Sequence, residues 1–369
     1  MKVLLVATVQ SHICQFHRPL VAMLHEHGCE VHVAARNNLA EKNGLKLDFV
    51  EQVFDVPFQR SPFSPKNLGA YKQLKKIIDE GNYDVVHCNT PVGGVVGRLA
   101  ARKARKRGTK VFYTAHGFHF YKGAPKKNWL IWYPVEKFMC RYTDKLITIT
   151  QEDCDLASAK FPTQVERIHG VGANSAKYRK LSKAECVELR HELGYADDDR
   201  LLLCTGELLP NKNQITAIRA MKSLINQQPQ VKLLLAGNGP TLPELQAEVA
   251  ALDLQNYVVF LGYRTDLERY ANIADVIVSC SYREGLPMNI VEGMLLGKPV
   301  VASYNRELIV PEKTGYIVPP ADSDAFAEKI AVLLNDGELA GRMGQAGYEK
   351  AQLYADTNVR RELQAVYEL

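Results

Sequence analysis

Two glutamates with seven residues between them, Glu284 and Glu292, lie in the segment of the chain with the clearest potential for chemistry. The segment reads REGLPMNIVEGM and follows an apolar run that ends at Cys280. We expect Glu284 in a strand-to-helix turn and Glu292 about a turn and a half into the following helix. The spacing alone is equally compatible with two solvated surface glutamates, but its place after a predicted strand favours a binding site.

The start of that helix predicts an anion site. Backbone N–H groups at a helix amino terminus have no partner within the helix and attract negative charge. Here they belong to Gly285, Leu286, Met288 and Asn289, and Pro287 is suited to a first helical turn. A diphosphate is the expected anion, and carboxylates beside it can accept hydrogen bonds from sugar hydroxyls.

Three further turns follow predicted strands in the second half of the chain. Their candidate residues are Gly206, Glu207 and Lys212, then Gly237 and Asn238, then Gly262, Tyr263 and Arg264. Lys212 can neutralise a phosphate as a point charge, with an ordinary exposed lysine as the alternative. The glycines are a weak indication of function because tight turns need glycine for steric reasons.

In the first half of the chain, the segment TAHGFHF places a histidine at the end of a predicted strand. This position favours a functional role for His116. For His119 we retain the ordinary interpretation of a satisfied surface or core residue.

The pattern of apolar residues predicts the strands and helices that position these candidate residues. Short apolar, β-branched runs alternate with helix-length segments, which is typical of parallel sheets covered on both faces. The predicted strands are 2–9, 30–35, 83–89, 110–116 and 144–150, then 200–206, 231–236, 257–262, 275–280 and 299–303. Two such series predict an α/β fold of two doubly wound, Rossmann-like domains, with the site in the cleft between them.

The domain boundary is expected in the glycine-rich stretch 169–180. We therefore predict an amino-terminal domain over 1–175 and a carboxyl-terminal domain over 176–351. The terminal segment 352–369 has a helical stripe of apolar residues, so it should pack on another element, such as the first domain.

The composition excludes several classes of protein. The chain has 369 residues, of which 46% are apolar and 24% charged, so a disordered, collagen-like or coiled-coil chain is excluded. Eight scattered cysteines without a C-x-x-C pair fit reduced, buried thiols, and neither disulfides nor a zinc site is expected.

The acidic run 197–199 is interpreted as a solvated loop. The first apolar run resembles a strand more than a signal peptide, and no run is long enough to span a membrane.

Charge is distributed unevenly between the halves. Residues 1–180 contain 28 basic against 15 acidic residues, a net of +13, whereas residues 181–369 have a net of −8. Residues 102–110 form one basic run, and a second at 122–127 directly precedes Trp129 and Trp132; lysines and arginines beside such aromatic residues suit an anionic membrane surface. A nucleic acid is disfavoured because no recognition motif is present, and a solvated helix face remains the alternative for the first run.

Taken together, the motifs resemble those of glycosyltransferase family 4, the retaining nucleotide-sugar transferases of GT-B fold. The matching segments are REGLPMNIVEGM, GELLPNKN, AGNGP and TAHGFHF, and the resemblance covers nearly the whole chain. The opening ATVQSHICQFHRP and the segment HCNTPVGG are similar to the branch that builds bacterial capsular, exopolysaccharide and O-antigen units.

The resemblance implies a role for each matching residue. Glu292 would hold the ribose of the donor, and Glu284 with the amides after it would hold the donor sugar and diphosphate. Lys212 would stabilise the leaving diphosphate, and His116 would contact the donor sugar. Ser11 and His12 would lie on the acceptor side. The family uses neither a metal nor a further cofactor.

Three departures from the family pattern stand out. Glu207 occupies a position where many members have arginine, so Lys212 would bear more of the phosphate charge. The segment 300–309 is shorter than the family's loop and lacks its glycines. The sequence VQSH, ending at His12, replaces a glycine-rich loop after the first strand.

We therefore predict a cytoplasmic, peripheral enzyme at the inner face of the membrane. It would transfer a sugar from a UDP-sugar to a polyprenyl-diphosphate-linked or other saccharide in bacterial surface polysaccharide synthesis. The alternative is a GT-B nucleotide-sugar epimerase that needs no acceptor. An NAD-dependent oxidoreductase is disfavoured because the turn after the first strand has no G-x-G-x-x-G.

Overall fold

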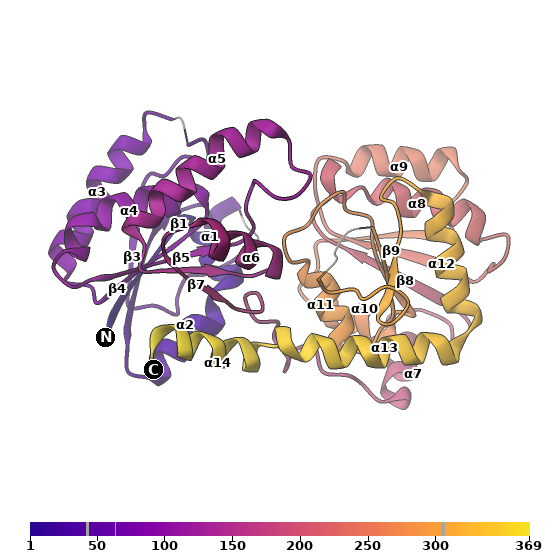
Figure 1. Ribbon diagram of the computed structural model, residues 1–369. Helices are drawn as coiled ribbons and strands as arrows, with labels where there is room; N and C mark the ends of the chain where they lie inside the picture. Colours follow the sequence, from indigo (N-terminus) through magenta and orange to yellow (C-terminus); the bar gives the residue numbers. More distant parts are fainter. Residues whose placement is uncertain (42–43, 63, 304–306) are drawn as a thin grey trace. The chain divides into compact units, whose positions relative to one another are not determined.

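The apolar runs of the sequence form two parallel sheets, each in its own unit of the chain (Figure 1). The computed structural model describes residues 1–41, 44–62, 64–303 and 307–369. Unit 1 comprises Met1–Gly172 and Asp356–Leu369, and unit 2 comprises Ala173–Ala355. These bounds lie within three or four residues of the predicted boundaries after 175 and 351.

The sheet of unit 1 has the order β3-β2-β1-β4-β5-β6-β7, and its neighbouring strands all run parallel. Its strands are β1 (Lys2–Val9), β2 (Glu30–Arg36), β3 (Gln52–Asp55), β4 (Val85–Asn89), β5 (Lys110–Ala115), β6 (Lys145–Thr148) and β7 (Gln164–Arg167). The middle of β1 is buried throughout, as expected for a strand covered on both faces.

The helices of unit 1 cover both faces of this sheet. They are α1 (Gln10–Phe16), α2 (Arg18–Glu26), α3 (Asn67–Gly81), α4 (Pro91–Arg105), α5 (Lys126–Met139), α6 (Gln151–Lys160) and α14 (Asp356–Tyr367). Helices α3, α4 and α5 lie on one side, and α2 and α14 lie together on the other (Figure 1). Helix α14 comes from the carboxyl end of the chain and is attached by Tyr367, whose hydroxyl lies 2.7 Å from Nδ1 of His87 in β4.

The sheet of unit 2 has the order β10-β9-β8-β11-β12-β13 and is also parallel. Its strands are β8 (Arg200–Thr205), β9 (Val231–Ala236), β10 (Val258–Gly262), β11 (Val276–Ser279), β12 (Val300–Ala302) and β13 (Gly315–Ile317). Its helices are α7 (Lys183–Glu192), α8 (Gln214–Leu224), α9 (Leu242–Ala251), α10 (Leu267–Ile273), α11 (Met288–Leu295), α12 (Ser323–Asn335) and α13 (Gly337–Ala351).

All ten predicted strands are confirmed, but three strands were not predicted. These are β3, β7 and β13, and each lies at an edge of its sheet. An edge strand has a neighbour on one side only, so its residues stay partly exposed and polar, as Gln52–Asp55 shows. The continuous apolar run that reveals a central strand is therefore missing in β3, whereas the fourth edge strand, β10, has such a run and was predicted.

In each sheet the chain first adds strands toward one side and then returns to the middle and adds the remaining strands on the other side. The two strands at which this change occurs are neighbours in the sheet. In unit 1 this switch lies between β1 and β4, and in unit 2 between β8 and β11. The loops that leave two such strands diverge and leave a crevice at the carboxyl ends, where open α/β sheets bind their ligands. The site is therefore expected at the turns after these four strands.

Candidate functional site

In unit 2 the switch point brings Lys212 and Glu284 together. Lys212 follows β8 and Glu284 follows β11, and Nζ of the lysine lies 2.6 Å from Oε1 of the glutamate. The same oxygen accepts a hydrogen bond from the hydroxyl of Ser281 at 2.5 Å. Both charged side chains keep some exposure, 25% for Lys212 and 13% for Glu284, so an anion can reach the ammonium group.

The turns after β8 and β9 touch backbone to backbone, which explains their glycines. A Cβ atom on Gly237 would lie 1.9 Å from the carbonyl oxygen of Gly206, and one on Gly239 would lie 2.2 Å from that of Leu208. Gly237 also has a φ of +152°, which side chains rarely allow. Asn238 accepts a hydrogen bond at its carbonyl oxygen from N–H of Leu208, at 2.9 Å, so the two turns form one rigid wall.

Helix α11 begins beside the same wall. Pro287 is its N-cap, one residue before the position that the sequence indicated, and Met288 and Asn289 open the helix. The side-chain amide of Asn289 donates to the carbonyl oxygen of Thr205 at the end of β8, at 3.1 Å. Together with Gly285 and Leu286 in the preceding turn, these residues place the helix amino terminus near the end of β8.

Glu292 lies within α11, and burial controls its protonation. Desolvation raises the pKa of its carboxyl to about 7, although a hydrogen bond from Tyr178 and the nearby charge of Lys177 oppose the rise. Tyr178 is itself buried, and burial together with Glu292 raises the pKa of its hydroxyl. Sequence reasoning missed Tyr178, because its segment has no motif and Glu292 lies far along the chain.

The remaining residues predicted in unit 2 have local partners. Arg264 forms a two-pronged ion pair with Asp266, with contacts of 2.8 and 2.6 Å. Tyr263 is exposed, and Gly262 accepts a hydrogen bond at its carbonyl oxygen from N–H of Gly237, at 2.8 Å. Glu207 is exposed at the turn after β8. Residues 304–306 of the segment 300–309 lie outside the described residues.

In unit 1, helix α1, the last residue of β4 and the turn after β5 bring His12, Asn89 and His116 together. His116 directly follows β5, and its Nε2 lies 3.2 Å from Oδ1 of Asn89 and 3.3 Å from Nε2 of His12. Burial lowers the pKa of His116 to about 4, and burial together with His116 lowers that of His12 well below its usual value. Both rings are therefore neutral at physiological pH.

Two further histidines lie beside this pair and were not singled out in the sequence. His17, between α1 and α2, and His87, in β4, are both buried, and burial lowers both pKa values. They differ in hydrogen bonding. His87 contacts Tyr367 and the hydroxyl of Thr114, each at 2.7 Å, whereas Nε2 of His17 has no partner among the described residues.

Ser11 stabilises the turn after β1. It is buried, its N–H donates to Oδ1 of Asn38 at 3.1 Å, and its hydroxyl oxygen accepts from Nδ2 of the same residue at 2.9 Å. At the end of β4, Thr90 has a φ of +64°, a conformation that non-glycine residues seldom adopt. Strain of this kind clusters at functional sites, where surrounding contacts must maintain it.

A pocket of about 290 Å³ opens next to His116. Its other lining residues are largely aromatic and include Tyr113, His119, Phe120 and Trp132, with the carboxylate of Glu136. Glu136 is buried and forms an ion pair of 2.7 Å with the fully buried Arg98. An aromatic wall with a single carboxylate suits a sugar ring, which presents both C–H and hydroxyl groups.

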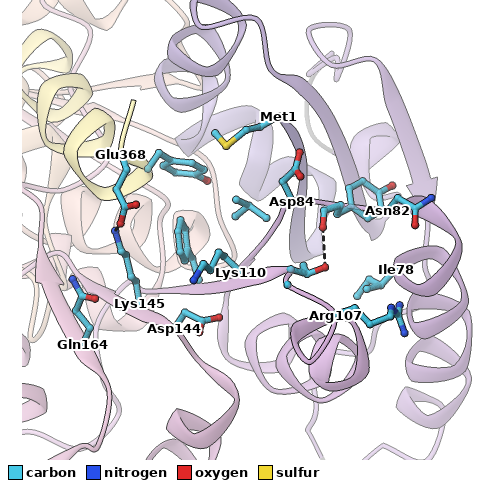
Figure 2. A pocket seen from close by; sticks show the side chains of 16 residues that line it. Met1, Ile78, Asn82, Asp84, Arg107, Lys110, Asp144, Lys145, Gln164 and Glu368 are labelled. Carbon is cyan, nitrogen blue, oxygen red and sulfur yellow. Dashed lines mark hydrogen bonds and ion pairs between the residues drawn. The ribbon is translucent and has the colours of Figure 1, made fainter.

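A second pocket of unit 1, with a volume of about 640 Å³, lies at the amino ends of the strands, at the end of the sheet away from His116 (Figure 2). Met1, Asp84 and Lys110 line it at the amino ends of the strands. Lys145 within it donates 2.7 Å hydrogen bonds to Glu368 and to the carbonyl oxygen of Val366. Because ligands of open α/β sheets bind at the carboxyl ends of the strands, we do not assign the site here.

Two family models match the chain, and between them they cover most of it. Residues 2–150 match the model described as glycosyl transferase 4-like, and residues 187–350 match glycosyl transferases group 1. Among the described residues, no helix has the length and apolar character needed to cross a membrane.

Individual proteins agree with the family models. The chain is 43% identical to the putative glycosyltransferase EpsD of Bacillus subtilis, over 99% of this chain and 96% of that protein. It is 26% identical to the UDP-Gal:alpha-D-GlcNAc-diphosphoundecaprenol alpha-1,3-galactosyltransferase of Escherichia coli, over 81% of this chain and 80% of that one.

A solved structure shows the same fold. The structure of Anabaena Alr3699/HepE in complex with UDP and glucose has a TM-score of 0.79 to this chain at 22% identity, covering all of both chains. At this identity the likeness concerns the fold alone. The predicted GT-B class, with two Rossmann-like α/β domains, is confirmed.

Proposed function

The chain belongs to the group 1 glycosyltransferases of bacterial polysaccharide synthesis, and from this membership we propose that it transfers a sugar from a UDP-sugar to a saccharide carried on a polyprenyl diphosphate. The observation that carries the donor assignment is the Lys212–Glu284 contact at the switch point of unit 2. The substrates of related proteins support this assignment. The Escherichia coli enzyme uses UDP-Gal and a diphosphoundecaprenol-linked sugar, and the Anabaena structure contains UDP.

On the donor side, three groups bind different parts of the UDP-sugar. Glu292 accepts hydrogen bonds from the ribose hydroxyls, and the amides at the start of α11 bind the diphosphate. Lys212 opposes the negative charge that grows as the diphosphate leaves, and a preorganised charge of this kind lowers the barrier to the reaction. With the lysine and the helix amino terminus supplying positive charge, the donor reaction as proposed requires no metal.

We propose that transfer proceeds with retention of configuration. Glu284 already contacts Lys212 and the hydroxyl of Ser281, and both contacts reduce the nucleophilicity of its carboxylate. The acceptor hydroxyl therefore attacks from the face that the diphosphate leaves, and a phosphate oxygen takes its proton. His116 contacts the transferred sugar as a neutral hydrogen-bonding group.

The acceptor saccharide is assigned to the aromatic pocket of unit 1. The pocket has His116 in its wall and lies at the carboxyl ends of β4 and β5. Open α/β sheets bind their ligands at this end of the strands. His12 lies beside His116 and is the nearest predicted acceptor-side residue. The contacts of Ser11 with Asn38 give it a supporting role in the turn rather than direct contact with the acceptor.

We further propose that unit 1 attaches to an anionic membrane through helix α5. The apolar residues Leu130, Ile131, Val135 and Phe138 are exposed along one side of this helix, with Leu130 at 77%. The exposed Lys126 and Lys127 open the helix. Exposed apolar residues beside lysines are suited to the boundary between lipid headgroups and acyl chains.

The two tryptophans next to this surface are part of our proposal only to the extent that they are exposed. Trp129 and Trp132 are partly buried against the core of unit 1. Nε1 of Trp129 donates to the carbonyl oxygen of Tyr121 at 3.2 Å, and Trp132 stacks on His119. In the basic run 102–110, Arg105 pairs with Asp144 and Arg107 with Asp79, so part of the charge of that run is neutralised within unit 1.

A reaction with and without acceptor tests the proposed function. The protein is incubated with a panel of UDP-sugars, alone and with a polyprenyl-diphosphate saccharide, and the products are separated by mass and by anomeric configuration. Sugar transfer that requires the acceptor and yields the α-anomer from an α-donor supports the proposal. Interconversion of UDP-sugars without acceptor would favour the epimerase, and an inverted product would refute the proposed mechanism.

A further inference from the structure

Three histidines of unit 1 point their ring nitrogens at one another. One nitrogen each from His12, His17 and His116 lies within 4.8 Å of the other two. The Nε2 atoms of His12 and His116 are 3.3 Å apart. His12 and His17 come from α1 and the turn after it, whereas His116 follows β5, so the parallel sheet brings the three together.

The hydrogen bonding around His17 distinguishes this cluster from an ordinary buried polar network. The residue is only 4% exposed, and its Nε2 has no hydrogen-bond partner among the described residues. The neighbouring His87 has a partner for each ring nitrogen. Buried polar atoms almost always have a partner in folded proteins, so an unpaired ring nitrogen on one histidine of this cluster points to a bound ion or water.

We propose that His12, His17 and His116 form a binding site for a divalent transition metal, with Zn²⁺ as the best-suited ion. Imidazole is a preferred ligand of zinc, and three protein ligands with an open fourth position are a common arrangement. Two imidazole nitrogens bound tetrahedrally at about 2.0–2.1 Å lie roughly 3.3 Å apart, which is the separation of His12 and His116. His17 completes the tetrahedral site after a movement of up to about 1.5 Å, because its ring nitrogen lies within 4.8 Å of the other two and a separation of roughly 3.3 Å is needed.

The metal would regulate the enzyme and would not assist the reaction. Zn²⁺ on Nε2 of His116 occupies the atom that contacts Asn89 and blocks the proposed contact with the transferred sugar. Bound zinc should therefore inhibit transfer, and a chelator should restore it. This consequence depends on the proposed function, whereas the binding of the metal does not.

Metal binding is tested directly on the full chain. The protein is freed of metal, titrated with Zn²⁺ by calorimetry, and examined with Co²⁺, whose visible absorption is strong in tetrahedral sites and weak in octahedral ones. We expect one zinc ion per chain and a tetrahedral cobalt spectrum. His12→Gln and His17→Gln should each weaken binding by more than tenfold, because removal of groups that only support metal ligands already costs roughly 10–100-fold.

His25→Gln is the matched control, because His25 is a partly exposed histidine of unit 1 that pairs with Glu51 outside the cluster. It should bind zinc as the wild type does. If His17→Gln fails to fold, the less buried His12→Gln decides the test. Absence of stoichiometric binding, or equal binding by the cluster variants and the control, would show that the unpaired nitrogen faces water only. Zinc binding without inhibition would leave the site intact and refute the proposed role of His116.

Discussion

Replacement of Glu292 by glutamine should make the free protein more stable above pH 7 and at the same time weaken nucleotide binding. The carboxyl of Glu292 has a pKa of about 7 in the folded protein and an ordinary value of 4.5, and burial is the main cause of the rise. The folded state therefore retains a proton between these two pH values that the unfolded state has lost. As a result, stability decreases as the pH rises through this range and levels off above pH 7.

The size of the effect follows from the shift. At roughly 1.36 kcal/mol per pKa unit, the shift from 4.5 to about 7 corresponds to about 3 kcal/mol. Glutamine cannot ionise, so Glu292→Gln should avoid this loss. We expect it to exceed the wild type by up to about 3 kcal/mol at pH 8 and to differ little at pH 4.5. Donor binding should show the opposite change, because loss of charge-assisted hydrogen bonds costs about 1.5–3 kcal/mol, or roughly 10- to 150-fold in the dissociation constant of UDP.

Urea unfolding from pH 4.5 to 8 measures the stability, and calorimetric titration with UDP at pH 8 measures the affinity. Glu328→Gln is the control, because Glu328 is an exposed glutamate of unit 2 that pairs only with the neighbouring Lys329 among the described salt bridges. It should change neither quantity. A stability difference for Glu292→Gln that does not vary with pH would refute the burial argument. An unchanged affinity for UDP would refute the assignment of Glu292 to the ribose.

Four further outcomes are expected. Lys212→Ala should lower kcat more than it raises KM, because the charge that it opposes grows only as the diphosphate leaves; an unchanged kcat in steady-state assays would contradict this. A chelator should not reduce transfer by the wild type, and inactivation by it would refute the metal-free donor reaction. Leu130→Glu with Phe138→Glu should release the protein from anionic vesicles in a flotation assay at low salt without changing its affinity for UDP, and equal flotation would refute the α5 surface. Gly237→Ala should destabilise the protein by roughly 1–3 kcal/mol in urea unfolding, because its Cβ would lie 1.9 Å from a carbonyl oxygen, and a neutral effect would show that the turn can move.

Much of the architecture can be predicted from local pattern. A central strand of a parallel sheet is buried on both faces, so it must be apolar along its length, and this local property marks β1, β8 and β9 in the sequence. The places where such strands end can be predicted as well, and this is why the sequence indicates Lys212 and Glu284 as candidate site residues. Three of the four edge strands were not predicted, because exposure on one side relaxes the same requirement.

The partners of the site residues depend on contacts between distant parts of the chain. Glu292 has a raised pKa because the fold buries it beside Tyr178, and no spacing in the sequence relates these two residues. Nε2 of His17 has no partner among the described residues, whereas both ring nitrogens of His87 have one, from Thr114 in β5 and from Tyr367 near the carboxyl end of the chain. The sequence by itself determined which strands form and which side chains stand at their ends, because burial and turn geometry act on neighbouring residues. Only the tertiary structure decided charge, protonation and pairing, because these depend on desolvation and on groups that lie far apart in the sequence.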